Sequence, residues 1–141
     1  MKELLERFVQ FERAIAAEKG EFGLFALFLR EDAGAGTSGY SGYSAKWDLI
    51  VAAPWIDGNR KDALPYITKR IQEAFSPSEL SQLSRIVLVD LTNPEVEEIN
   101  RAVRVQSGQT EIRDSNFFGL RIKHAYIITS QRTNVDQQIP A

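Results

Sequence analysis

The segment KWDLIVAAPW, residues 46–55, has the pattern of a strand buried in the middle of a sheet. Past Asp48 its apolar residues occupy both alternating positions, which is typical of a strand that is covered on each face. Pro54 ends the run, because proline cannot donate a hydrogen bond to a neighbouring strand. This segment therefore predicts a sheet with covering layers on both sides.

The chain before this strand contains a loop, another strand and a helix. Residues 34–44 hold four glycines, which favours a loop because glycine loses the most backbone entropy on ordering. The run FGLFALFLRED, residues 22–32, is apolar on both faces and predicts a second central strand. Further upstream, one apolar stripe at helical spacing predicts a helix that Gly20 ends, with Glu12 placed away from that stripe. The stripe consists of Leu4, Leu5, Phe8, Phe11 and Ile15.

The chain after this strand predicts helices and three further strands. Asp57 to Asn59 favour a turn, and helical spacing then predicts a helix over about 61–75. Ser76-Pro77-Ser78-Glu79 has the form of a capping box that starts a short helix. RIVLVDL, residues 85–91, predicts a third buried strand, and Asn93-Pro94 opens another short helix.

The last part of the chain has a different pattern. Residues 110–113 and 120–129 predict two antiparallel strands, half exposed and joined by DSNFFG, residues 114–119. We predict a single α+β domain over residues 1–130, with a mixed sheet of about five strands in the order α-β-β-α-α-β-α-β-β. Residues 131–141 form a polar tail.

Composition restricts the function. The 141 residues include no cysteine, which excludes thiolate metal sites and cysteine nucleophiles. A net charge of -2 argues against a dedicated nucleic-acid binder, although the last third is locally basic. The first 20 residues lack the apolar core of a signal peptide, and no apolar run has the length of a membrane span. We therefore expect a soluble cytoplasmic protein that does not enter a membrane.

Few residues could carry chemistry. His124 is the only histidine, and the usual behaviour of histidine favours a structural, hydrogen-bonded role for it. Asp48 begins one strand and Asp90 ends another, so both could hold a divalent cation if they meet at one end of the sheet. Solvation and local hydrogen bonding explain such aspartates equally well.

Two further groups could bind a ligand. The loop could hold a phosphate or nucleotide with backbone N–H groups, although it matches neither common glycine-rich fingerprint. Its candidate residues are Ser38, Gly39, Ser41 and Gly42, while Tyr40 and Tyr43 could stack on a base or a protein partner. Arg113, Arg121 and Lys123 could form a basic surface that contacts phosphates, with a solvated strand face as the default.

Two of these segments also carry a family resemblance. KWDLIV, residues 46–51, and VLVDLTNPEVEEI, residues 87–99, resemble the second-strand and third-strand motifs of the minimal nucleotidyltransferases of the DNA polymerase beta superfamily. The resemblance implies that Asp48 and Asp90 hold Mg²⁺. Lys46 stands where the family has its first aspartate, and a lysine there competes with the cation.

Three interpretations follow from the sequence. We favour a small binding or regulatory module, which binds another protein or its own copy, because no complete catalytic constellation is present. The alternatives are a divergent metal-dependent nucleotidyltransferase-like enzyme and nucleic-acid contact through the basic hairpin.

Overall fold

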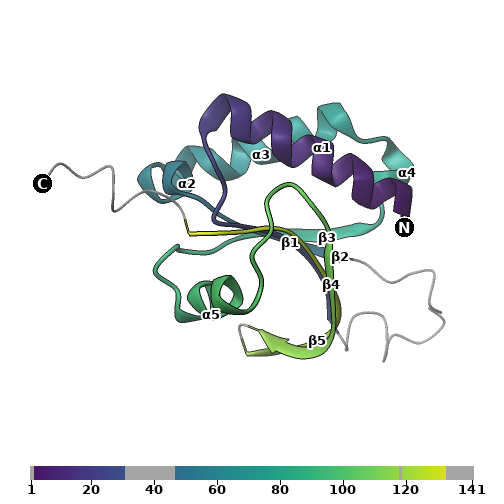
Figure 1. The fold of residues 1–141 in the computed structure, drawn as a ribbon. Coiled ribbons are helices and arrows are strands. Elements are labelled where there is room, and N and C mark those ends of the chain that lie inside the picture. Colours follow the sequence, from purple (N-terminus) through teal and green to yellow (C-terminus); the bar gives the residue numbers. More distant parts are fainter. Residues whose placement is uncertain (1, 31–46, 118, 133–141) are drawn as a thin grey trace, which may run out of the picture.

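The protein consists of a central five-stranded sheet with helices on both faces. The structure is a computed structural model and describes residues 2–30, 47–117 and 119–132. Figure 1 shows helices α1 to α4 on one side of the sheet and α5 on the other. The predicted α+β class with a mixed sheet of five strands is therefore confirmed.

The elements follow one another in roughly the predicted order. In chain order they are α1 (Lys2–Lys19), β1 (Leu24–Arg30), β2 (Trp47–Ala52), α2 (Pro54–Gly58), α3 (Arg60–Ala74), α4 (Pro77–Leu80), β3 (Leu83–Leu88), α5 (Pro94–Ala102), β4 (Thr110–Phe117) and β5 (Leu120–Ser130). The strands lie side by side in the order β3-β2-β1-β5-β4. Only β2 and β3 pair in parallel, and every other neighbouring pair is antiparallel.

Two hydrophobic cores, one on each face, hold the layers together. Phe8 and Ile15 of α1 and Ile67 of α3 pack on one face of the sheet. On the other face, Val96 and Ile99 of α5 pack against a second set of strand residues. Alternating residues of β1 and β2 divide between the two cores, which confirms that both strands are buried on each side.

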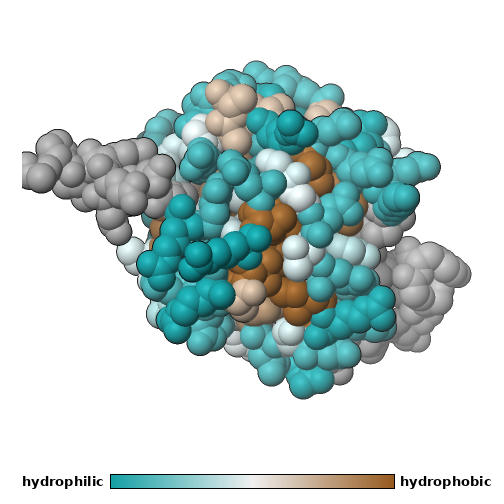
Figure 2. All heavy atoms as spheres, viewed as in Figure 1, coloured by the Kyte–Doolittle hydropathy of each residue, from teal (hydrophilic) through white to brown (hydrophobic). Residues whose placement is uncertain are grey.

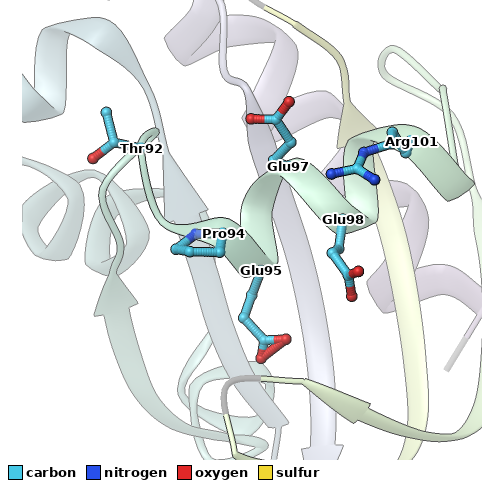
Figure 3. Close-up of a pocket in the computed structure, with 6 residues that line it drawn as sticks. All are labelled: Thr92, Pro94, Glu95, Glu97, Glu98 and Arg101. Atoms are coloured by element: carbon cyan, nitrogen blue, oxygen red, sulfur yellow. The ribbon is translucent and has the colours of Figure 1, made fainter.

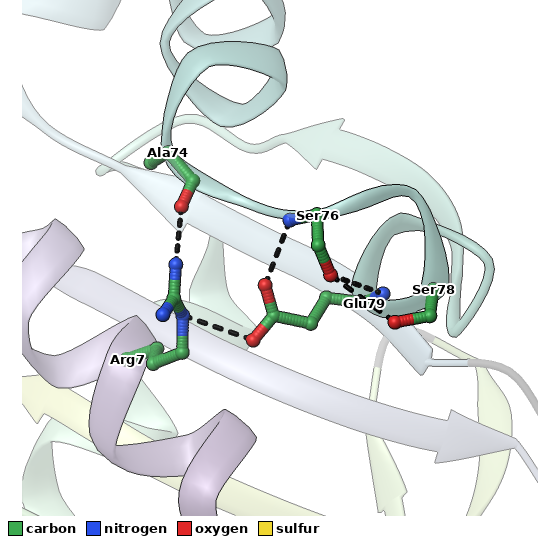
Figure 4. A network of polar contacts seen from close by, with 5 residues as sticks. All are labelled: Arg7, Ala74, Ser76, Ser78 and Glu79. Atoms are coloured by element: carbon green, nitrogen blue, oxygen red, sulfur yellow. Dashed lines mark hydrogen bonds and ion pairs between the residues drawn. The ribbon is translucent and has the colours of Figure 1, made fainter.

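Helix α1 is also tied to the turn between α3 and α4. Ser76 and Glu79 form the predicted capping box, with the Glu79 backbone N–H donating to the Ser76 hydroxyl at 3.2 Å. Figure 4 shows that Arg7 reaches this box from α1, where its Nε lies 2.9 Å from the Glu79 carboxylate, and donates to the carbonyl of Ala74. The cap therefore fixes the start of α4 and its position against α1.

Three local predictions are wrong. The turn predicted at Asp57 to Asn59 is instead the end of a further helix, α2, because Pro54 occupies its first turn, where a missing N–H costs no hydrogen bond. The joining segment predicted at 114–119 begins too early, because residues 115–117 pair with β5 and continue β4 although Asp114 has a positive φ of 51°. Glu12 lies on the buried face of α1.

Strand β5 is more buried than predicted. It lies between β1 and β4, so its residues from Ala125 to Ser130 are buried or half-buried, whereas the sequence predicted a half-exposed hairpin strand. Its pairing with β1 shifts register twice. At one shift Ile128 and Thr129 both turn toward α1, so the simple alternation of the sequence does not assign their faces.

A buried polar network joins α1, β5 and the segment before β4. The Glu12 carboxylate accepts hydrogen bonds from the hydroxyls of Ser107, at 2.6 Å, and Thr129, at 2.8 Å. The backbone N–H of Ser107 donates to the same threonine hydroxyl at 3.0 Å. These contacts compensate for the loss of water around a carboxylate that is only 1% exposed.

Candidate functional site

Asp48 lies inside the protein at the start of β2. It is 2% exposed, and one of its carboxylate oxygens lies 3.2 Å from Nε of Arg85 on β3. The two residues are register partners across the parallel β2–β3 pair. The guanidinium is half exposed and belongs to β3, the outer strand. The contact therefore links a buried carboxylate to a side chain at the surface.

Asp90 lies at the other end of the same strand pair. Its carboxylate is 62% exposed and contacts the guanidinium of Arg60 at the start of α3. Arg60 also donates to the carbonyl of Leu88 at 3.1 Å, and Asp57 accepts from the backbone N–H of Leu91 at 3.2 Å. This group of contacts stabilises the end of β3.

The structure does not bring Asp48 and Asp90 together. Asp48 lies opposite Arg85, and β3 advances roughly 10 Å from there to Leu88, with Asp90 beyond it. Parallel strands begin at the same end of the sheet and finish at the opposite end. The first residues of β2 and the residues after β3 therefore cannot converge. Within the described residues, no group of three or more histidine, aspartate or glutamate side chains is placed to hold a metal ion.

His124 belongs to a polar and aromatic cluster on β4, β5 and the start of β2. Its Nε2 contacts the carboxylate of Glu111, which also accepts from Nη2 of Arg113 at 3.1 Å. The rings of Trp47 and Tyr126 lie 5.8 Å and 4.7 Å from the imidazole. The cluster gives His124 a hydrogen-bonded structural environment.

The charges of this cluster shift two pKa values. The hydrogen bonds from Arg113 and then from His124 hold the pKa of Glu111 below its ordinary value. Burial raises the pKa of Tyr126, and the Glu111 carboxylate raises it further. Both groups therefore keep their usual charge at neutral pH, with Glu111 ionised and Tyr126 neutral.

The three candidate basic residues lie at different positions on the hairpin. Arg113 lies opposite His124, and its charge is offset by Glu111. Arg121 lies opposite Asn116, roughly 10 Å nearer to the turn, and Lys123 is exposed between these positions. The candidate phosphate residues Ser38, Gly39, Ser41 and Gly42, with Tyr40 and Tyr43, lie outside the described residues.

A shallow pocket lies beside α5. It has a volume of about 440 Å³ and is lined by Thr92, Pro94, Glu95, Glu97, Glu98 and Arg101. Figure 3 shows the carboxylates of Glu95 and Glu97 on opposite sides of the helix, so they do not point at a common centre. This depression is an outer helix surface with no convergent set of ligands.

The two edges of the sheet differ in character. Edge strand β4 carries three charged side chains, Glu111, Arg113 and Asp114, and bends at the last of them. Edge strand β3 carries only Arg85, followed by the half-buried Ile86, Val87 and Leu88. Charges and local distortion are how natural sheets protect an edge against further pairing. β4 is therefore protected, whereas the distortion of β3 is limited to a register shift between Leu83 and Arg85, so the segment from Ile86 to Leu88 is the open part of that edge.

The backbone of β3 offers hydrogen-bonding groups on its outer side. The N–H of Val89 donates to Val51 on β2, so the N–H and C=O groups of Leu88 and Ile86 point the other way. Arg60 occupies the outward carbonyl of Leu88. No other strand of the described chain pairs with β3 on this side, so Ile86 is the centre of the open edge.

Leu64 lies beside this edge. Arg60, one turn earlier on the same side of α3, reaches the outer side of Leu88, whereas Tyr66 and Arg70 face α1. The four residues from Arg60 to Leu64 advance about 6 Å along α3, and the two residues from Leu88 back to Ile86 span a similar distance. Leu64 therefore flanks Ile86, and at 41% exposure it is the most exposed large hydrophobic side chain of the described residues.

Other apolar side chains also reach the surface. Figure 2 shows a mainly hydrophilic face with a hydrophobic strip at its centre, between the α1 layer and α5. In Figure 1 this is the side where the segment from α5 to β4 passes in front of the sheet. Val105 of that segment pairs with Ser130 of β5. The segment therefore lies on the β4 side of the sheet, away from the open edge of β3.

Comparison with known proteins identified no relative. No family model matches the chain, and neither a curated protein nor a solved structure is significantly similar to it. Among the described residues, no helix is both long and apolar enough to cross a membrane. The geometry of the described residues is therefore the basis for a functional proposal.

The sequence did not indicate the open edge. RIVLVDL has the composition of a buried strand, and its parallel pairing with only one neighbour is a property of the topology. The helical spacing that predicts the helix over 61–75 groups Leu64 with Ile67 and Ile71, but only the two isoleucines are buried. A signal was present in the pattern, since the adjacent Ala63 fits the buried arc better than Leu64 does.

Proposed function

We propose that this protein is a binding module that recognises a polypeptide by adding a β-strand to the open edge of β3. The observation that carries the proposal is the difference between the edges, since β4 is protected by charges and a bend while β3 exposes backbone groups beside apolar side chains. In strand addition, backbone hydrogen bonds supply affinity and neighbouring side chains supply specificity.

The side chains around β3 fit this role. Ile86 and Leu88 are half-buried on the α3 side, and Leu64 extends the apolar surface onto the helix. The two arginines that border the edge are paired within the chain, Arg85 with Asp48 and Arg60 with Asp90. An approaching strand therefore meets little unbalanced charge.

The proposal can be tested with peptide ligands selected from a displayed library of random extended sequences. Binding is then compared for the wild type, Ile86→Pro and Ile86→Ala. Both variants lose the isoleucine side chain, but only proline removes the outward N–H, and that group is not needed for the β2–β3 ladder.

We expect the peptides to bind the alanine variant and to lose roughly tenfold or more in affinity for the proline variant, since one backbone hydrogen bond and the strand geometry are both lost. Circular dichroism and thermal unfolding would check that both variants are folded. Peptides that bind the two variants equally, or a monomeric protein for which the selection yields no peptide, would contradict the proposal.

A further inference from the structure

We infer that the strand bound at the edge of β3 is β3 of a second copy of this chain, in a symmetric dimer with a continuous ten-stranded sheet. This inference rests on the proposed function and names its partner. The position of the hydrogen-bonding groups, the exposure of Leu64 and the charges at the edge support it.

The hydrogen-bonding groups of the edge are self-complementary. Ile86 is the central outward residue of β3, so a two-fold axis beside it pairs Ile86 with Ile86 of the second copy. The register of β3 against β2 shifts at Ser84, and Arg60 occupies the carbonyl of Leu88, so the pairing is centred on the residues next to Ile86. Antiparallel pairing about such an axis is isologous, which means that the contact closes and does not continue into a fibre.

Leu64 favours a second copy over an isolated peptide. It belongs to α3, the layer above the sheet, and flanks Ile86, so the same two-fold axis brings the Leu64 side chains of the two copies toward each other. A single added strand would leave most of this side chain in water. A second copy supplies a strand and a helix together and covers both parts of the surface.

The charges permit self-association. A surface with unbalanced charge repels its own copy, because the same sign meets itself across the axis. Arg85 contacts Asp48 at 3.2 Å, and Arg60 contacts Asp90, so both cations that border the edge are offset within one chain. The β4 edge differs, because Asp114 distorts the strand with its positive φ and Glu111, Arg113 and Asp114 place charges along it.

The inference can be tested by chemical cross-linking of a single introduced thiol. The chain has no cysteine, so Leu64→Cys places one reactive group beside the proposed axis. Gln10→Cys, on the exposed side of α1, is the matched control. Both variants are treated with a short bis-maleimide, and the mass of the wild type is measured by sedimentation over a concentration series.

We expect the wild type to form dimers as its concentration rises. Covalent dimers should form with Leu64→Cys and not with Gln10→Cys. Ile86→Pro should weaken the dimer roughly tenfold or more, while Ile86→Ala should retain more of the association. A folded Leu64→Lys variant should be monomeric, and Gln10→Lys, which adds the same charge elsewhere, should behave as the wild type.

The failures of the two proposals are distinguishable. A wild type that stays monomeric, yet binds selected peptides in a manner that needs the Ile86 N–H, overturns the dimer and leaves strand addition in place. A dimer that cross-links through Gln10→Cys and not through Leu64→Cys overturns the inferred interface. A monomer that also yields no peptide overturns both proposals.

Discussion

The two edges of this sheet show how one fold protects one side and leaves the other open. Strand β4 is antiparallel, charged and bent at Asp114, and the segment before it is fixed to α1 through Ser107 and Glu12. Strand β3 is parallel and apolar, and Arg60 stabilises only its end. The difference shows that a strand with the apolar composition of a buried strand can lie at the edge of a sheet. Its apolar side chains are then partly exposed at the surface.

The largest expected effect is a difference in stability between proline variants on the inner and outer sides of β3. Val87→Pro should destabilise the fold by about 3 kcal/mol or more, because the N–H of Val87 faces β2 and its loss breaks the ladder. Ile86→Pro should cost less, since its N–H faces outward. Urea unfolding of both variants would measure the difference, and equal losses would show that the outward and inward sides are assigned incorrectly.

The next effect concerns the hydrogen bonds of Glu12, which join α1 to the segment before β4 and to β5. Glu12→Ala should lower the free energy of unfolding by about 2–3 kcal/mol, because the hydroxyls of Ser107 and Thr129 lose their acceptor inside the protein. Glu12→Gln keeps an acceptor oxygen and should lose less. The Ser107 amide should exchange its hydrogen faster in the alanine variant. An unchanged exchange rate would show that Glu12 does not hold this segment in place.

A smaller effect should appear at the ion pair between β2 and β3. Arg85→Ala should cost about 2 kcal/mol, because it removes a cation from beside a carboxylate that cannot reach water. Asp48→Asn should cost about 1 kcal/mol, since the half-exposed Arg85 can be solvated again. Thermal unfolding of the two single variants would compare them, and the opposite ranking would contradict this account of the pair.

The smallest effect depends on pH and lies on β4. Because the pKa of Glu111 is lowered in the folded state, its carboxylate stabilises the fold above the ordinary glutamate pKa, and this contribution is lost as the pH falls through the folded-state pKa. Glu111→Gln should therefore be less stable than the wild type at neutral pH and should approach it in acid.

Unfolding by urea at neutral and acidic pH would measure this convergence. Arg113→Ala should weaken the same pH dependence, because Arg113 is the main cause of the shift. A stability difference between Glu111→Gln and the wild type that stays constant with pH would exclude the proposed linkage.

Local patterns predicted the elements better than their arrangement. The capping box at Ser76 and Glu79 forms as predicted, because its hydrogen bonds link residues only three apart. The burial of Glu12 could not be predicted, since it depends on Thr129, which is 117 residues away. Asp114 likewise lies within a strand although its φ is 51°, because Arg113 and Ser115 on either side of it pair with β5.

The candidate site was less predictable than the fold. Asp48 and Asp90 stand at strand ends as the sequence indicated, but the parallel direction of β2 and β3 sets them apart. His124 has the hydrogen-bonded environment that its residue type favours. The open edge arises from strand order, which no local pattern encodes.

The position of β5 has a consequence for the order in which the chain can fold during synthesis. This strand is the last of the five in the sequence, yet it lies between β1 and β4 and meets α1 through Ile128 and Thr129. While the ribosome is still making residues 120–130, β1 has a partner on one side only and α1 lacks part of its contact surface. The two hydrophobic cores are therefore completed only after β5 has been made. Contacts between residues so far apart in the sequence slow folding.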